Sequence, residues 1–170
     1  DKSRSRGLGD VYKRQSYTRT ARNKTPVLYD GREDEVQIGR GIVHGDGKDV
    51  TIVACGVMVS RSLEAAELLR ADGIGATVVD MHTLKPLDTD LLDRLAASTG
   101  CMVTAEDHSI IGGLGGAVAE HLISSRPIPL ERVGVQDRFG ESAQAEEMLE
   151  MMGLTAPDVA AAAHRAIGRK

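Results

Sequence analysis

Hydrophobic residues along the chain fall into two kinds of segment that alternate. Short, continuous apolar runs such as DVTIVAC at 49–55 and ATVVDM at 76–81 are typical of strands buried on both faces of a sheet. Between them lie longer segments with apolar residues at helical spacing, as for Leu63, Ala66 and Leu69, which predict helices with one buried face. This alternation predicts an α/β domain with a parallel sheet and helices on both sides.

Strand and helix boundaries follow from the same pattern and from residues that start or stop helices. The predicted strands are 36–43, 49–55, 76–81, 101–105 and 130–135. The predicted helices are 57–72, 88–100, one that follows the glycine-rich turn and runs to about 125, 144–152 and 156–167. Asp88 can cap a helix start, Thr155 and Asp158 form a capping box, and Gly73, Gly100 and Gly153 suit helix ends. Taken alone, the short turn at 44–48 favours a hairpin between 36–43 and 49–55.

The stretch VTAEDHSIIGGLGG at 103–116 joins a buried strand to a helix and concentrates polar residues and glycines. Glu106, Asp107 and His108 would lie at the carboxyl edge of the sheet, where open α/β folds usually bind ligands. The glycines leave the helix start without side-chain bulk, which permits close approach by an anion or by another helix. Close packing is the preferred interpretation; the glycines concerned are Gly112, Gly113, Gly115 and Gly116.

Composition limits the classes of function. With 170 residues, 41% hydrophobic and 27% charged, the chain is expected to form one ordinary domain. A net charge of −4 and the absence of tryptophan argue against a nucleic-acid surface. No apolar run is long enough to span a membrane and no leader is recognisable, so we expect a cytoplasmic protein without a membrane partner, with Cys55 and Cys101 as buried thiols. Residues 1–15 are basic and aperiodic; they are interpreted as a foreign, adaptor-derived tail, with a natural basic tail as the alternative.

Three stretches together resemble one family. DMHTLKPLD at 80–88, VTAEDHSIIGGLGGAVAE at 103–120 and VGVQDRFGESA at 133–143 are similar to the C-terminal domain of transketolase. The resemblance implies a three-layer α/β/α domain at 35–170, preceded at 16–34 by the end of another domain and a linker. It also implies a five-stranded, mostly parallel sheet in the order 1-3-2-4-5, with strand 1 antiparallel and beside 76–81. We prefer this order to the hairpin.

The implied order places the topological switch point between the strands that end at 55 and 105. A crevice there would be lined by residues 56–60 and 106–113, with His82 on the same edge. His108 with Glu106 or Asp107 could form an acid–base pair. The family places this loop at a domain and subunit interface, so the preferred role for these residues and for His82 is structural or interfacial.

The resemblance also implies a function for the whole enzyme. Transketolases transfer a two-carbon ketol unit between sugar phosphates, a reaction of the pentose phosphate pathway, with thiamine diphosphate and a divalent metal such as magnesium. The cofactor lies between two preceding domains, which are absent here. We therefore expect an assembly and dimerisation domain that is not catalytic alone and binds no cofactor alone. Its partners would be the catalytic domains or an N-terminal subunit, in a homodimer.

Two alternatives remain open at this point. The chain could be a stand-alone anion- or nucleotide-binding module that uses the crevice. It could also be the C-terminal domain of a 1-deoxyxylulose-5-phosphate synthase or of a 2-oxoacid dehydrogenase β subunit, which are related to transketolase.

Few residues qualify for chemistry. Arg19 resembles the family's arginine that grips the substrate phosphate, a task suited to a guanidinium, or it is a solvated linker residue. The GDG sequence at 45–47 begins like the thiamine-diphosphate metal motif, but that motif needs an asparagine about 25–30 residues later for a second oxygen ligand. The only asparagine is Asn23, which lies upstream. No catalytic residue and no metal site are predicted.

Overall fold

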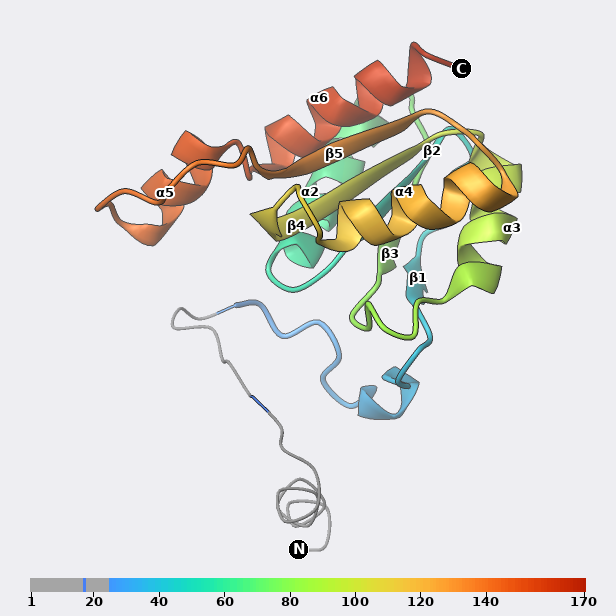
Figure 1. The fold of residues 1–170 in the computed structure, drawn as a ribbon, viewed down its shortest axis with the longest axis horizontal. Coiled ribbons are helices and arrows are strands. Elements are labelled where there is room, and N and C mark those ends of the chain that lie inside the picture. Colours follow the sequence, from blue (N-terminus) through green and yellow to red (C-terminus); the bar gives the residue numbers. More distant parts are fainter. Residues whose placement is uncertain (1–16, 18–24) are drawn as a thin grey trace, which may run out of the picture.

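A five-stranded mixed sheet lies at the centre of the molecule (Figure 1). The computed structural model describes residue 17 and residues 25–170. The strands are β1 (Ile42–His44), β2 (Val50–Ala54), β3 (Ala76–Asp80), β4 (Met102–Ser109) and β5 (Leu130–Val135), and their spatial order is β1-β3-β2-β4-β5. β1 runs antiparallel to β3 and the other neighbours pair in parallel. The order and direction inferred from the family resemblance are confirmed.

The first strand differs from what the hydrophobic pattern alone suggested. The hairpin with 49–55 is wrong: β1 pairs with β3, so that Ile42 lies opposite Asp80 and His44 opposite Val78. The strand is also shorter than 36–43, since Val36 and Ile38 are exposed and lie outside it. Their alternation with polar residues resembles a strand, but in the structure neither residue belongs to one.

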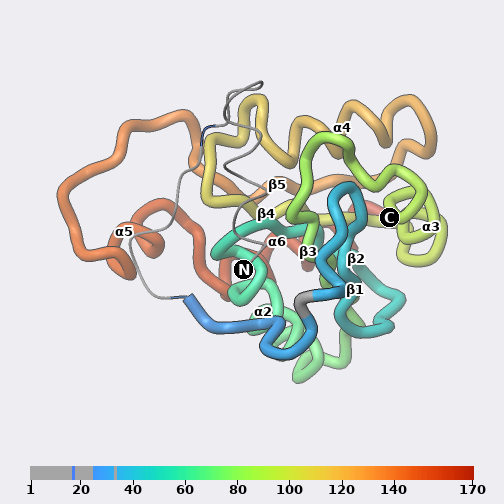
Figure 2. Tube along the Cα trace, turned by 90° about the horizontal axis from the view of Figure 1, so that it is seen from below, coloured from blue at the N-terminus to red at the C-terminus, as the bar shows by residue number. Residues whose placement is uncertain are grey.

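Helices cover both faces of the sheet and divide the core in two (Figure 2). The helices are α2 (Met58–Ala71), α3 (Thr89–Thr99), α4 (Leu114–Ser125), α5 (Ala145–Met152) and α6 (Ala156–Ile167), and residues Glu33–Glu35 form one 3-10 turn. α2 and α6 pack on one face, where Ile52, Met58 and Leu69 are fully buried. α3 and α4 pack on the other, around Met81, Leu92 and Leu114. No helix in the described residues is both long and apolar enough to cross a membrane.

The helix termini follow the sequence signals. The Asp88 carboxylate accepts from the backbone N–H of Leu91, and α3 ends at Gly100 in the left-handed conformation. Thr155 and Asp158 form the capping box of α6. Each side chain satisfies a backbone donor that the helix itself leaves without a partner. The boundaries predicted from these residues are therefore confirmed within one or two positions.

Asp88 also ties the segment before β1 to the domain. Its second carboxylate oxygen accepts from the backbone N–H of Gly41 at 3.0 Å, and its side chain is 7% exposed. One carboxylate therefore fixes both the start of α3 and the entry into the edge strand.

We expect Asp88→Ala to lower the free energy of unfolding by about 2 kcal/mol, the sum of a lost helix cap and a second lost hydrogen bond. Urea unfolding followed by circular dichroism measures it. Asp90→Ala is the matched control, because Asp90 is exposed in the first turn of the same helix. An equal loss in both variants would contradict the double role of Asp88.

Candidate functional site

The carboxyl end of β4 is closed by one of its own side chains. β4 continues past Ala105, where the sequence predicted its end, and its pairing with β5 is interrupted between Ala105 and Ser109. Glu106 is 2% exposed, and its carboxylate accepts from the backbone N–H groups of Leu114 at 2.7 Å and Gly115 at 2.8 Å. These groups form the first turn of α4, where the helix dipole favours a negative charge. The anion at this helix start is thus an internal carboxylate.

Two of the four glycines make this contact possible. A Cβ atom on Gly113 would lie 2.0 Å from Glu106 Oε2, and one on Gly115 would lie 2.8 Å from Thr104 Oγ1. Gly116 and Gly112 have no such neighbour, although Gly112 has a positive φ of 74°. The close approach inferred from the sequence is therefore made at Gly113 and Gly115, by a side chain of β4 and not by a second helix.

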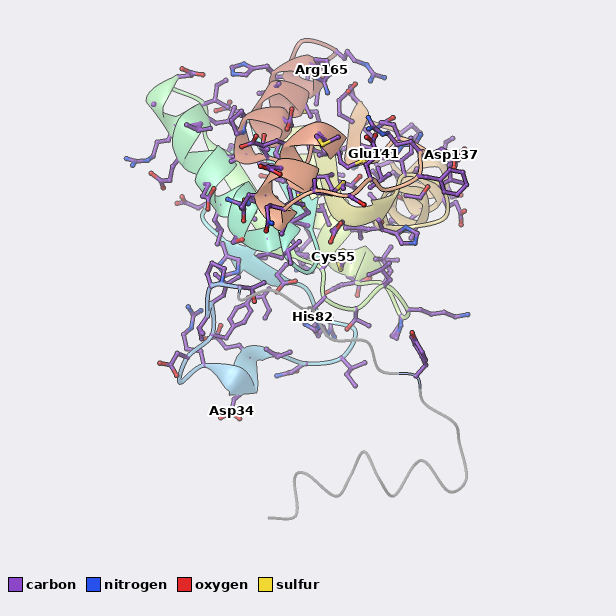
Figure 3. The ribbon with its side chains drawn as sticks, turned by 90° about the vertical axis from the view of Figure 1, so that its left-hand side faces the viewer. Asp34, Cys55, His82, Asp137, Glu141 and Arg165 are labelled. Carbon is purple, nitrogen blue, oxygen red and sulfur yellow. The ribbon has the colours of Figure 1, made fainter. Side chains whose placement is uncertain are left out.

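A cleft of about 340 Å³ opens beside the next strand ends. Its walls come from the end of β3 (Asp80, His82), from the start of α2 (residues 56, 57 and 60) and from residues 25, 26, 28 and 29. The sequence predicted residues 56–60 and His82 at this edge. Residues 106–113 do not line the cleft, because Glu106 turns its carboxylate into α4. Figure 3 shows His82 and Cys55 on the side of the domain that faces the segment carrying Asp34.

Tyr29 connects the N-terminal segment to the cleft wall. Its hydroxyl donates to Asp80 Oδ2 at 2.7 Å and lies 3.1 Å from His44 Nε2. Burial and the hydrogen bond to the Asp80 carboxylate both raise the pKa of Tyr29 above its ordinary value, so the phenol remains a donor. Asp80 itself is 7% exposed.

Negative charge gathers around the strand ends. Burial raises the pKa of the Cys55 thiol to about 12, and the carboxylates of Glu106, Asp80 and Asp107 add to the effect. Cys55 and Cys101 are both free, and Cys101 is fully buried. A thiol held protonated in this way is a poor nucleophile, which argues against a reactive cysteine at the edge.

The other predicted residues lie in different surroundings. Asp107 and His108 are exposed, and His108 Nδ1 is 3.8 Å from Glu106 Oε2. The two residues do not line the cleft, and whether they form an interface stays a prediction. Arg19 lies outside the described residues, as does the boundary predicted at residue 16. Among the described residues no group of three or more potential metal ligands occurs.

Sequence reasoning missed Asp80 and Tyr29. Both carried a signal: Asp80 is an acidic residue at the end of a buried strand, two positions before His82, and Tyr29 is one of four aromatic residues in the chain. The link between them spans 51 positions, which no local pattern can reveal.

Fold and site together define an α/β domain whose carboxyl edge is largely closed by its own side chains. Comparison with known proteins identifies its class: residues 39–159 match the family described as "Transketolase, C-terminal domain". The chain therefore belongs to the transketolase C-terminal domain family.

Individual relatives extend this result. The chain is 47% identical over 144 residues to a 6-deoxy-6-sulfo-D-fructose transketolase subunit of Clostridium sp. (strain MSTE9), covering 85% of this chain and 45% of the relative. It is 46% identical over 123 residues to a 1-deoxy-D-xylulose-5-phosphate synthase of Chlorobium luteolum, and the match covers 72% of this chain and 20% of the relative. A solved split-gene transketolase, described as an inactive beta4 tetramer, has 52% identity and a TM-score of 0.84. The match covers 88% of this chain and 48% of the solved chain. The chain thus spans less than half the length of each relative.

We expect Glu106→Ala to lower the free energy of unfolding by about 3 kcal/mol, because two buried N–H groups lose a charged acceptor. Added formate should occupy the space left by the carboxylate and raise the melting temperature of the variant more than that of the wild type. Asp107→Ala, at the exposed neighbouring position, is the control and should respond like the wild type. An equal formate response in all three proteins would show that the carboxylate is not what the helix start binds.

Proposed function

We propose that this chain is the assembly domain of a thiamine-diphosphate-dependent enzyme of the transketolase type, and that it does not catalyse the reaction alone. The observation that carries the proposal is the internal carboxylate at the start of α4: the helix terminus best placed to bind a diphosphate already binds Glu106. Family membership and the 47% identity to a transketolase subunit support it. The reaction of the whole enzyme would be ketol transfer between sugar phosphates, in the cytoplasm.

The chain's residues do not fit the cofactor's metal. The GDG turn at 45–47 is a structural turn, since a Cβ on Gly47 would lie 2.2 Å from the backbone carbon of Gly75. Asp46 is exposed, and no second oxygen ligand of the motif follows it in the sequence. Cofactor and metal would therefore be held by other domains or by an N-terminal subunit. The closed start of α4 also argues against the anion- or nucleotide-binding module.

A second candidate function, the C-terminal domain of a 1-deoxyxylulose-5-phosphate synthase, has a specific observation in its favour. The 46% identity to a 1-deoxy-D-xylulose-5-phosphate synthase shows that the same domain occurs in enzymes with a different overall reaction. The proposed assembly role applies to both enzymes, because the domain would lie outside the reacting centre in each.

The proposed assembly surface lies at the carboxyl ends of β4 and β5. Ile111 is 63% exposed and follows the end of β4, which carries Asp107 and His108, and Phe139 is 96% exposed and follows the end of β5. Large exposed apolar side chains beside polar ones are common at protein–protein interfaces. The occupant we propose is a second copy of this chain, in line with the homotetramer named for the solved split-gene transketolase.

Thiamine diphosphate with Mg²⁺ should leave the melting temperature of the isolated chain unchanged, since a ligand that binds the native state must raise it. Differential scanning fluorimetry, with Mg²⁺ alone as the control, measures the shift. A rise that grows with cofactor concentration would contradict the proposal.

Phe139→Ser should weaken self-association of the chain at least about tenfold, because exposed aromatic residues dominate such interfaces. Sedimentation velocity over a range of protein concentrations measures the constant. Ile123→Ser is the matched control: Ile123 is 76% exposed but lies near the far end of α4. A monomeric wild type, or equal losses in both variants, would refute this surface.

A further inference from the structure

The cleft beside β3 has two buried polar atoms on its lining residues that lack hydrogen-bond partners. One is Asp80 Oδ1, on a side chain that is 7% exposed, and the other is His82 Nε2. Buried polar atoms without partners are few in native proteins, and each costs stability. Two of them in the wall of one cleft point to a group that binds there.

Both atoms can accept hydrogen bonds. Asp80 uses its other oxygen, Oδ2, to accept from Tyr29. His82 Nδ1 lies 2.9 Å from Thr83 Oγ1. When Nδ1 carries the ring proton and donates it to Thr83, Nε2 keeps a lone pair that can accept a hydrogen bond. A group that binds to both atoms as acceptors must therefore supply hydrogen-bond donors.

The charge and the shape of the cleft limit which chemical groups can bind in it. Among the described residues, no lysine or arginine lines the cleft and none forms a salt bridge with Asp80. The carboxylates that raise the Cys55 pKa add negative potential at this edge. The outer walls include the apolar side chains of Pro26, Leu28 and Val57. Such a site repels phosphate and suits a cationic head on an aliphatic stem.

We propose that this cleft binds a guanidinium or ammonium group carried on an alkyl chain, with Asp80 Oδ1 and His82 Nε2 as its acceptors. A guanidinium fits best, because its planar fork offers five N–H donors and a permanent charge. Both acceptor atoms are covered from solvent, so the entering group has to shift side chains of the wall. The group comes either from a basic side chain of a neighbouring polypeptide or from a free alkylamine or alkylguanidine.

Titration of the full 170-residue chain with n-butylguanidinium tests the proposal, with n-butylurea as the neutral compound of the same shape. Backbone amide shifts of Gly56, Val57 and Ser60 and the ring signals of His82 report binding. We expect saturable shifts with butylguanidinium and at least about tenfold weaker ones with butylurea, as for loss of a charge-assisted hydrogen bond. Equal shifts from both compounds, or none from either, would overturn the proposal.

Two variants distinguish binding in the cleft from non-specific electrostatic attraction to the protein surface. Asp80→Asn keeps an oxygen for Tyr29 and removes the charge, so it should weaken binding about tenfold. Asp107→Asn removes an exposed charge outside the cleft and should change nothing. Should Asp80→Asn fail to fold, Ser60→Leu narrows the cleft without touching either acceptor and should abolish the shifts. Unchanged binding in a folded Asp80→Asn, or in Ser60→Leu, would overturn the assignment.

A third compound distinguishes the two sources. N-acetyl-arginine N′-methylamide carries the same head and stem on a peptide backbone. Binding as tight as that of butylguanidinium means that the cleft mouth admits a polypeptide, which assigns a basic side chain as the occupant. Binding of the butyl compound alone assigns a free small molecule. Either result supports the shared chemistry.

Discussion

The two hydrogen bonds from the start of α4 to Glu106 determine how the carboxyl edge of this domain is built. A buried carboxylate needs hydrogen-bond donors, and the free N–H groups of a helix start need an acceptor. Each group therefore removes the free-energy cost of leaving the other buried without a partner. The contact fixes the position of α4 against β4 and requires glycine at 113, where a side chain would meet the carboxylate. The bulge in the β4–β5 pairing follows Ala105, at the point where Glu106 turns inward.

The Asp80 carboxylate, two strands away in the sheet, has a similar position at a strand end, but only one of its two oxygens has a hydrogen-bond partner. Asp80 ends β3 as Glu106 lies near the end of β4, and the order β3-β2-β4 puts one strand between them. Glu106 has both oxygens bonded to backbone N–H groups, whereas Asp80 has one oxygen bonded to Tyr29 and one without a partner. The difference follows from what comes next in the chain: a glycine-rich helix start approaches Glu106, while Asp80 is followed by His82 and a loop that donates nothing to it. At one strand end the chain itself satisfies both carboxylate oxygens, and at the other it leaves Asp80 Oδ1 without a partner.

Local chemistry in the sequence predicted most of the fold. Asp88, Thr155 and Gly100 act on their own neighbours, so their effects could be inferred without knowing the rest of the chain. The pairing of β1 could not, since it depends on which edge of the sheet is free, and only the family resemblance indicated β3. At the site, Glu106 and the glycines were recognised as important, but their partner was not. Whether a helix start binds an outside anion, a helix or an inside carboxylate depends on the side-chain direction of residue 106, which a strand bulge sets.

Tyr29 couples the position of the N-terminal segment to the surroundings of the cleft. It lies in the segment before β1, and its hydroxyl donates to the Asp80 carboxylate in the cleft wall. Any displacement of that segment therefore alters the surroundings of Asp80, and any cation on Asp80 competes with or reinforces the Tyr29 hydrogen bond. Because binding and segment position act on the same carboxylate, the two are thermodynamically linked. Binding at Asp80 can in this way set how firmly the segment that carries Tyr29 is held against the sheet.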